Sequence, residues 1–257
     1  MPRPWIARKW KRIAIGLGIG LLLCGVYTWF FGFNTMMILE MRSIAMESPI
    51  VRQIPRPLPD LSVSSAPGTK LSYFGYEFEV PWDDIDAKSI NVKRTRLVVY
   101  SRGGNGLVFS SAQPKEFINI ILDKDGGLDK SNFQQIYGNA PLQSDYAMHC
   151  LILNATPDNV TLFSSRKDVV GTSMLVVIKS IMSQSELFSI QNKDFKGFQW
   201  GDPKHLPLHV NADLFSDEGG MEFIFLRRKD ATSPALTQPE INRVLQTVRK
   251  TPDPHVN

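Results

Sequence analysis

The feature that most constrains this chain is an apolar run near its N-terminus. The segment IAIGLGIGLLLCGVYTWFFGF, residues 13–33, is 21 residues long and has no charged side chain. Because about 20 apolar residues cross the ~30 Å hydrocarbon core of a bilayer, we predict a transmembrane signal anchor that contacts membrane lipid. The alternative is a cleaved signal peptide, but the run is longer than such a peptide needs and no small-x-small cleavage site follows it.

The charges around the run predict its orientation. Five basic residues precede it, whereas only Arg42, Arg52 and Arg56 follow it before the body begins. By the positive-inside rule, residues 1–12 form a cytoplasmic basic tail and the rest of the chain lies outside the cytosol. We therefore expect a single-pass protein of the bacterial inner (cytoplasmic) membrane with a periplasmic or extracellular C-terminal domain.

The basic character of the chain belongs to its leader. Residues 1–60 contain eight Lys and Arg against three acids, a net charge of +5, and residues 61–257 contain 21 bases against 22 acids, a net charge of −1. A body without excess positive charge lacks the electrostatic footprint of a nucleic-acid-binding domain. We predict no nucleic-acid partner.

The two cysteines exclude a disulfide within the body. Cys24 lies in the apolar run, so the exported part has Cys150 alone. Cys150 stands in the apolar stretch DYAMHCLIL, which favours a buried small residue over a nucleophile.

Two segments connect the run to the body. Residues 34–47 place Met37, Met41 and Ile44 at helical spacing, which predicts a juxtamembrane helix that lies on lipid or, as the alternative, grips a partner helix. Residues 48–70 contain five prolines and no period, which is typical of a stiff spacer. Within the run, Gly16 and Gly20 form G-x-x-x-G, a spacing that suits a homodimer.

The body, residues 71–250, alternates between strand and helix patterns, and residues 251–257 are expected to be a disordered tail. YFGYEFEV, residues 73–80, has the period of a half-buried strand ended by Pro81. RTRLVVYS and GLVFS follow as strands, then a helical middle that ends with residues 166–182, then four more strands. Thr237 and Glu240 form a capping box that opens a last helix.

This order predicts an α+β fold, a mostly antiparallel sheet packed with helices as an α/β/α sandwich. The opening GYEFEVPW, the helical middle, the run of strands and the closing helix resemble the PsbP/Mog1-like group. The resemblance covers about residues 71–250 and implies adaptor or assembly roles beside membrane complexes, without shared catalytic residues.

The candidate chemical motifs favour structural roles. Glu77 and Glu79 project from one side of a strand, as solvated strand residues do, and Asp83, Asp84 and Asp86 follow Pro81 as turn caps. DKDGGLD, residues 123–129, lacks the glycine and glutamate positions of a calcium loop. His205 and His209 are too far apart on a strand to share one metal ion.

Basic residues on two stretches can either protect sheet edges or meet an anionic surface (Arg94, Arg96, Arg102, Arg227, Arg228 and Lys229). We assign no catalytic, cofactor-binding or metal-ligating residue and predict no cofactor.

The leading hypothesis is a non-catalytic, membrane-anchored module that binds a protein partner in an envelope complex, for accessory, assembly or sensing purposes. The first alternative is a membrane-anchored hydrolase whose site is assembled from residues distant in sequence. The second is an extracytoplasmic small-ligand-binding domain with Tyr76, Phe198 and Trp200 in its pocket. Two polar groups converging in a deep cleft would favour the hydrolase, and a closed apolar cavity would favour the ligand-binding domain.

Overall fold

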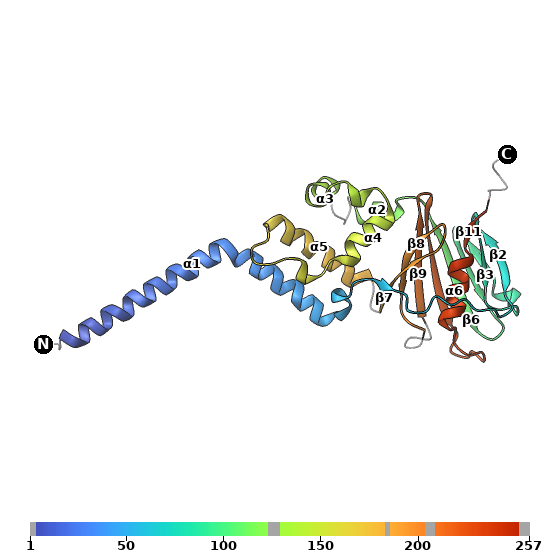
Figure 1. The fold of residues 1–257 in the computed structure, drawn as a ribbon, viewed down its shortest axis with the longest axis horizontal. Helices are drawn as coiled ribbons and strands as arrows, with labels where there is room; N and C mark the ends of the chain where they lie inside the picture. The colour runs from blue at the N-terminus through green and yellow to red at the C-terminus, as the bar shows by residue number, and fades with distance from the viewer. Residues whose placement is uncertain (1–3, 123–128, 183–185, 204–208, 252–257) are drawn as a thin grey trace.

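The computed structural model describes residues 4–122, 129–182, 186–203 and 209–251 (Figure 1). One long helix, α1 (Pro4–Glu47), opens the chain, and its N-terminal part projects away from the body. The section Leu17–Glu47 is long and apolar enough to cross a membrane. The large side chains of this section are mostly exposed up to Phe30, as lipid-facing residues of a span would be.

The last third of α1 belongs to the body. Asn34, Ile38, Met41 and Ala45 recur at helical spacing and are buried against α5 (Arg166–Met182) and the short 3₁₀ helix η1 (Pro49–Arg52). The expectation of a juxtamembrane helix on lipid is therefore wrong for this face, because α5 of the same chain covers it. The outward-facing Met36 and Met46 remain exposed.

The proline-rich segment is not a spacer. Its residues Ile50, Val51 and Leu58 are buried, and β1 (Arg56–Pro57) pairs in parallel with β7 (Leu187–Gln191). The amide of Asn242 then donates to the carbonyls of Asp60 and Ser62. The sequence predicts a spacer because the prolines leave no helical or strand periodicity of apolar residues. The apolar side chains of the segment nevertheless pack on the body.

The main sheet has eight strands in the order β1-β7-β8-β9-β10-β6-β5-β4, and all neighbours except β1 and β7 are antiparallel. Its other strands are β4 (Asn91–Lys93), β5 (Arg96–Tyr100), β6 (Asn105–Ala112), β8 (Lys196–Trp200), β9 (His209–Ser216) and β10 (Gly219–Arg227). A second sheet has the order β11-β3-β2, with β11 (Arg249–Lys250), β3 (Tyr76–Val80) and β2 (Thr69–Tyr73). The α+β class is confirmed.

The first predicted strand is instead part of a hairpin. Phe74 and Gly75 both have positive φ, 54° and 78°, and turn the chain from β2 into β3. The apolar alternation continues through this turn, so the period alone hides it. The face predicted for Tyr76, Phe78 and Val80 is correct, since all three side chains are buried.

Each face of the main sheet carries its own packing. On the inner face, the small sheet and α6 (Gln238–Thr247) close over a core in which the rings of Phe78, Phe109 and Phe223 meet at 4.9–5.4 Å. On the outer face, α4 (Asp145–Asn154) packs Leu153 against Phe198, one of the side chains of β7 to β9.

The remaining helices are short. They are η2 (Ala87–Ser89), α2 (Glu116–Ile121), α3 (Lys130–Tyr137), η3 (Ala140–Leu142) and η4 (Pro157–Asn159). η2 packs beside β5. The other short helices, with α4, α5 and the end of α1, form the part of the body nearest the projecting helix, and the two sheets lie farther out (Figure 1). The predicted capping box of Thr237 and Glu240 is present.

Candidate functional site

The seam between α4 and the outer face of the main sheet gathers several ionisable side chains. α4 begins at its N-cap Ser144, whose hydroxyl accepts a hydrogen bond from the Ala147 amide. From there, one side of the helix directs Asp145 and His149 inward. Asp213 on β9 and Glu222 on β10 are opposite each other on the sheet below.

His149 is held in one tautomer and almost sealed from water. Its Nδ1 lies 2.9 Å from the Asp145 carbonyl oxygen, which can only accept, so Nδ1 carries the proton. Nε2 is then the unprotonated nitrogen and lies 4.0 Å from Oδ2 of Asp213. The side chain is 4% exposed, and burial lowers the pKa of His149 to about 4, opposed only by its backbone hydrogen bond.

Asp213 is the carboxylate that faces this imidazole. Burial under α4 raises the pKa of Asp213, and the negative charge of Glu222 on the neighbouring strand raises it further. The raised pKa of Asp213 and the lowered pKa of His149 both favour an uncharged pair. The pair therefore avoids the cost of burying unbalanced charges between helix and sheet.

Asp145 has a structural task. Its Oδ1 accepts a hydrogen bond of 3.0 Å from the amide of Ile118 and so caps α2, whose own N-cap residue, Lys115, makes no side-chain cap. Burial raises the pKa of Asp145, and the backbone hydrogen bonds from Ile118 and its neighbours lower it in part.

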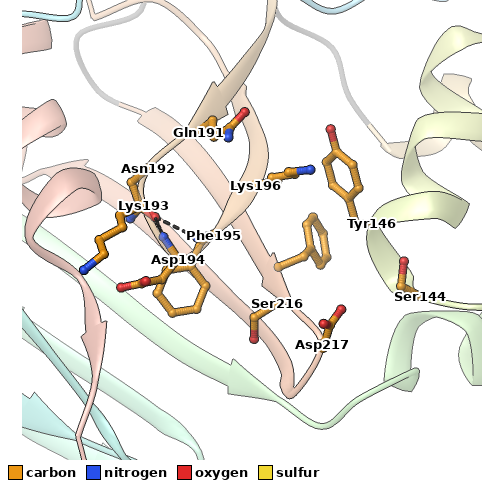
Figure 2. A pocket seen from close by; sticks show the side chains of 11 residues that line it. Ser144, Tyr146, Gln191, Asn192, Lys193, Asp194, Phe195, Lys196, Ser216 and Asp217 are labelled. Carbon is orange, nitrogen blue, oxygen red and sulfur yellow. Dashed lines mark hydrogen bonds between the residues drawn. The ribbon is translucent and has the colours of Figure 1, made fainter.

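A small pocket opens beside the seam (Figure 2), and one of its lining residues, Phe215, also packs on the His149 ring with the centroids 4.6 Å apart. Its volume is about 300 Å³. Tyr146 of α4 and Lys196 of β8 approach each other from opposite walls. The charged lining residues balance in sign, two lysines against two aspartates (Lys193, Lys196, Asp194 and Asp217). A pocket so small, open and neutral offers little to hold a charged ligand.

Cys150 is a free cysteine four residues after Tyr146 on α4. Burial raises the pKa of Cys150, and its hydrogen bond with Tyr146 and the positive charge of Lys196 oppose this in part. The imidazole of His149 turns toward Asp213 and the thiol toward Tyr146, so the two do not form a nucleophile–base pair. His149 and Asp213 do converge from distant parts of the chain, with side chains that are 4% and 24% exposed, but they line no pocket among those found in the described residues.

The acidic strand residues form ion pairs. Oε1 of Glu77 lies 2.6 Å from Nη2 of Arg249, and Oε1 of Glu79 lies 2.7 Å from Nη2 of Arg243. Asp86 caps η2 by accepting from the Lys88 amide. The two glutamates thus fasten β3 to α6 and to β11.

The three aromatic residues expected in a ligand pocket do not line one. Tyr76 belongs to the inner core, whereas Phe198 and Trp200 belong to the cluster under α4 on the opposite face of the sheet. The ligand-binding arrangement based on these side chains is wrong, because the main sheet lies between Tyr76 and the other two side chains.

The other candidate motifs are distributed as follows. Residues 123–128 of the calcium-like loop and His205 lie outside the described residues, and His209 begins β9. Of the basic residues, Arg94 and Arg96 lie at the start of β5, whereas Arg102 lies beyond its end. Within the described ranges, no group of three or more His, Cys, Asp and Glu side chains could hold a metal ion.

Sequence reasoning missed Lys179, a buried cation on α5. Its ammonium donates to the carbonyls of Gln53, Leu153 and Ala155, and it is 1% exposed. Burial lowers the pKa of Lys179 to about 8. The one signal in the sequence is its position three residues after Val176, on the buried stripe of the helix.

Comparison with known proteins finds no relative. No protein-family description matches the chain. No curated protein and no solved structure matches it either. The resemblance to the PsbP/Mog1-like group therefore stays a prediction, and function has to be argued from this geometry.

Proposed function

We propose that this chain is a single-pass membrane protein whose body lies outside the cytosol and binds another protein without performing chemistry. The observation that carries the proposal is the continuity of α1, which serves both as the apolar span and as part of the body. The amide of Asn34 donates to the carbonyls of Leu162 and Ser164, and Met41 is fully buried. The apolar section and the section packed in the body are therefore parts of one continuous helix.

A rigid mount supports a docking role. A body on a flexible tether samples many orientations, and a partner must restrict them when it binds. A body fixed to its span presents one face at one height and angle above the bilayer. This preorganisation favours assembly with a partner in the same envelope complex, whereas an enzyme acting on a diffusing substrate gains less from it.

The ionisable groups support the non-catalytic part of the proposal. Glu77 and Glu79 neutralise arginines, and Asp145 caps a helix. His149 is buried between helix and sheet, where its Nε2 faces Asp213. An active site would need such groups in an accessible cleft with a nucleophile or base free to act.

We place the docking surface on the outer face of β5, β6 and β10, which we term the open face (Val98, Tyr100, Val108, Ile224 and Leu226). Val98, Val108 and Ile224 form one cross-strand row, and Tyr100 and Leu226 lie on the next. None of the five belongs to the hydrophobic clusters that the described residues form. All except Val108 remain at least partly accessible.

The charges bordering the open face indicate the kind of partner. Arg96 continues the row of β5 beside Val98, and the guanidinium of Arg228 lies 4.2 Å from the centre of the Tyr100 ring. An apolar centre with a basic border is complementary to a protein surface of apolar and acidic side chains.

The test uses the full-length protein in its native membrane. A photo-crosslinking residue at Val98 or at Ile224 should capture the same protein, and one at Ile120, which is 66% exposed on α2, should not. The purified partner should then bind the full chain about tenfold or more weakly after Ile224→Glu, with Ile120→Glu as the matched control. Equal weakening by both variants would contradict the docking surface, and turnover of a substrate by the purified protein would contradict the absence of chemistry.

A further inference from the structure

The loop 161–165 carries a strongly exposed phenylalanine. Phe163 is 85% exposed and sits between η4 and α5. Its ring meets that of Phe31 on α1 edge to face, with the centroids 5.4 Å apart. The exposed ring therefore lies beside the outer end of the apolar span.

The loop holds this position through hydrogen bonds. The Asn34 amide binds the carbonyls on both sides of Phe163, those of Leu162 and Ser164. The Ser164 hydroxyl accepts from the Thr161 amide at 2.9 Å, and the Ser164 amide donates to the Thr161 carbonyl. A turn pinned in this way presents Phe163 outward as a fixed feature.

An apolar groove runs from this ring along α1. Its volume is about 530 Å³, and its apolar walls come from Ile38 and Leu39 on one side and Val160 and Leu162 on the other. Arg42 lines the same groove and forms no ion pair or hydrogen bond within the described part of the chain.

The direction of the groove matches the depth profile of a bilayer. Tyr27 at one end and Arg42 at the other are 15 positions apart on α1, about 22 Å at ~1.5 Å per residue. Tyr27 belongs to the apolar run, so this end lies at the hydrocarbon. Arg42 is nine positions beyond Phe33, about 14 Å at ~1.5 Å per residue, and its long side chain reaches the headgroups by extending back along α1 toward the membrane. An acyl chain fits the apolar walls, and a phosphate fits the unpaired guanidinium.

We infer that this loop is a second membrane contact, in which Phe163 inserts beside α1 and the groove holds one phospholipid with its phosphate at Arg42. The inference rests on the proposed membrane anchoring of α1. It explains why a phenylalanine is left uncovered by the rest of the protein, since lipid covers it. It also gives the body a second attachment, which would limit its tilt about the span.

The test compares single cysteines in the full-length chain, in a background of Cys24→Ala and Cys150→Ala. An environment-sensitive label is placed at Leu21, Phe163 or Ile181, and the protein is inserted into phosphatidylglycerol and phosphatidylcholine vesicles that contain a spin-labelled lipid quencher. Ile181 is the matched control because it is 79% exposed but lies at the opposite end of α5 from Arg166, which stacks on Phe33.

The label at Phe163 should be quenched about threefold or more strongly than the label at Ile181, and the label at Leu21 should be quenched as well. Equal quenching at Phe163 and Ile181, with strong quenching at Leu21, would overturn the inference and leave the anchor intact. Weak quenching at Leu21 would instead overturn the anchoring itself.

The lipid in the groove is tested with a photoactivatable phosphatidylglycerol whose reactive group lies in the acyl chain. Adducts should map to α1 near Leu39 and to the segment at Leu162. Arg42→Gln should reduce these adducts by about fivefold, and Lys130→Gln, on exposed α3, should leave them unchanged. Equal yields from the two variants, or adducts confined to the rest of the span, would overturn the lipid site.

Discussion

Nζ of Lys179 lies 2.6 Å from the carbonyl oxygen of Leu153, at the C-terminal end of α4. The same ammonium binds the carbonyls of Ala155 and Gln53, so one side chain joins α5, the end of α4 and the proline-rich segment. A cation at the C-terminus of a helix also complements the negative end of the helix dipole. This contact connects the helices that hold α1 to the edge of the main sheet.

Replacing this side chain tests how much the junction depends on it. Lys179→Met keeps the apolar stem but leaves three carbonyl groups without their donor, and we expect the free energy of unfolding to fall by about 2 kcal/mol. Lys167→Met, on the exposed side of the same helix, should change it by less than about 0.5 kcal/mol. Denaturant titration of both variants measures the difference, and similar values would show that the buried cation adds nothing.

The buried imidazole predicts an acid-sensitive component of stability. The pKa of His149 is about 4 in the folded protein against an ordinary value of 6.5, so the unfolded chain binds more protons between these two pH values. The stabilisation is complete above pH ~6.5 and is lost as the pH falls toward ~4, to a total of about 3 kcal/mol. Asp213, Glu222 and Asp145 face the same seam, so the comparison must isolate His149.

The difference in unfolding free energy between the wild type and His149→Gln isolates it. The advantage of the wild type should shrink by about 3 kcal/mol from pH 7 to pH 4, because glutamine does not titrate. Asp213 has a raised pKa, so its own contribution has the opposite sign, but both proteins retain it. A difference that stays constant with pH would mean that His149 is not buried as an uncharged ring.

The two arginine–glutamate pairs on β3 form a matched comparison. The side chains of Arg243 and Glu79 are 13% and 23% exposed, whereas Arg249 in the pair with Glu77 is 60% exposed. Arg243→Met leaves a largely buried carboxylate unpaired and should cost about 1–2 kcal/mol of unfolding free energy. Arg249→Met should cost less than about 0.5 kcal/mol, since water screens its pair. Thermal unfolding of both variants tests the order, and the reverse order would contradict it.

The link between span and body predicts a local change in dynamics. Asn34→Ala removes the two hydrogen bonds to the carbonyls of Leu162 and Ser164. We expect amide hydrogen exchange in the loop 161–165 to accelerate by about tenfold, while α6 keeps its protection. Thr35→Ala is the control, because its hydroxyl binds only the Phe31 carbonyl and the Tyr27 hydroxyl of the same helix. Unchanged exchange in the loop would argue against a rigid mount.

Several elements could be predicted because their signals are local. The limits predicted for the helix 166–182 agree with α5. The capping box of Thr237 and Glu240 also occurs as expected. Caps and apolar stripes involve neighbours three or four residues apart, so a short window of sequence contains the whole interaction.

Other features depend on contacts that no local window contains. His149 and Asp213 come from α4 and β9, and only the packing of that helix on the sheet brings them to 4.0 Å. The turn at Phe74 and Gly75 interrupts a strand whose alternation looks continuous. Sequence patterning likewise could not separate Tyr76 from Trp200, because both are aromatic strand residues and only the assembled fold places the main sheet between them.

By itself, the sequence determined an apolar helix long enough to cross a membrane, the α+β class and the ends of the well-capped helices, since each follows from composition or from neighbours along the chain. Only the tertiary structure decided that α1 continues into the body and that the proline-rich segment packs on the body. It also decided which charged side chains are buried. The physical reason is that burial is a property of the assembled chain. A side chain such as Lys179 or Met41 becomes buried only when segments distant in sequence close around it.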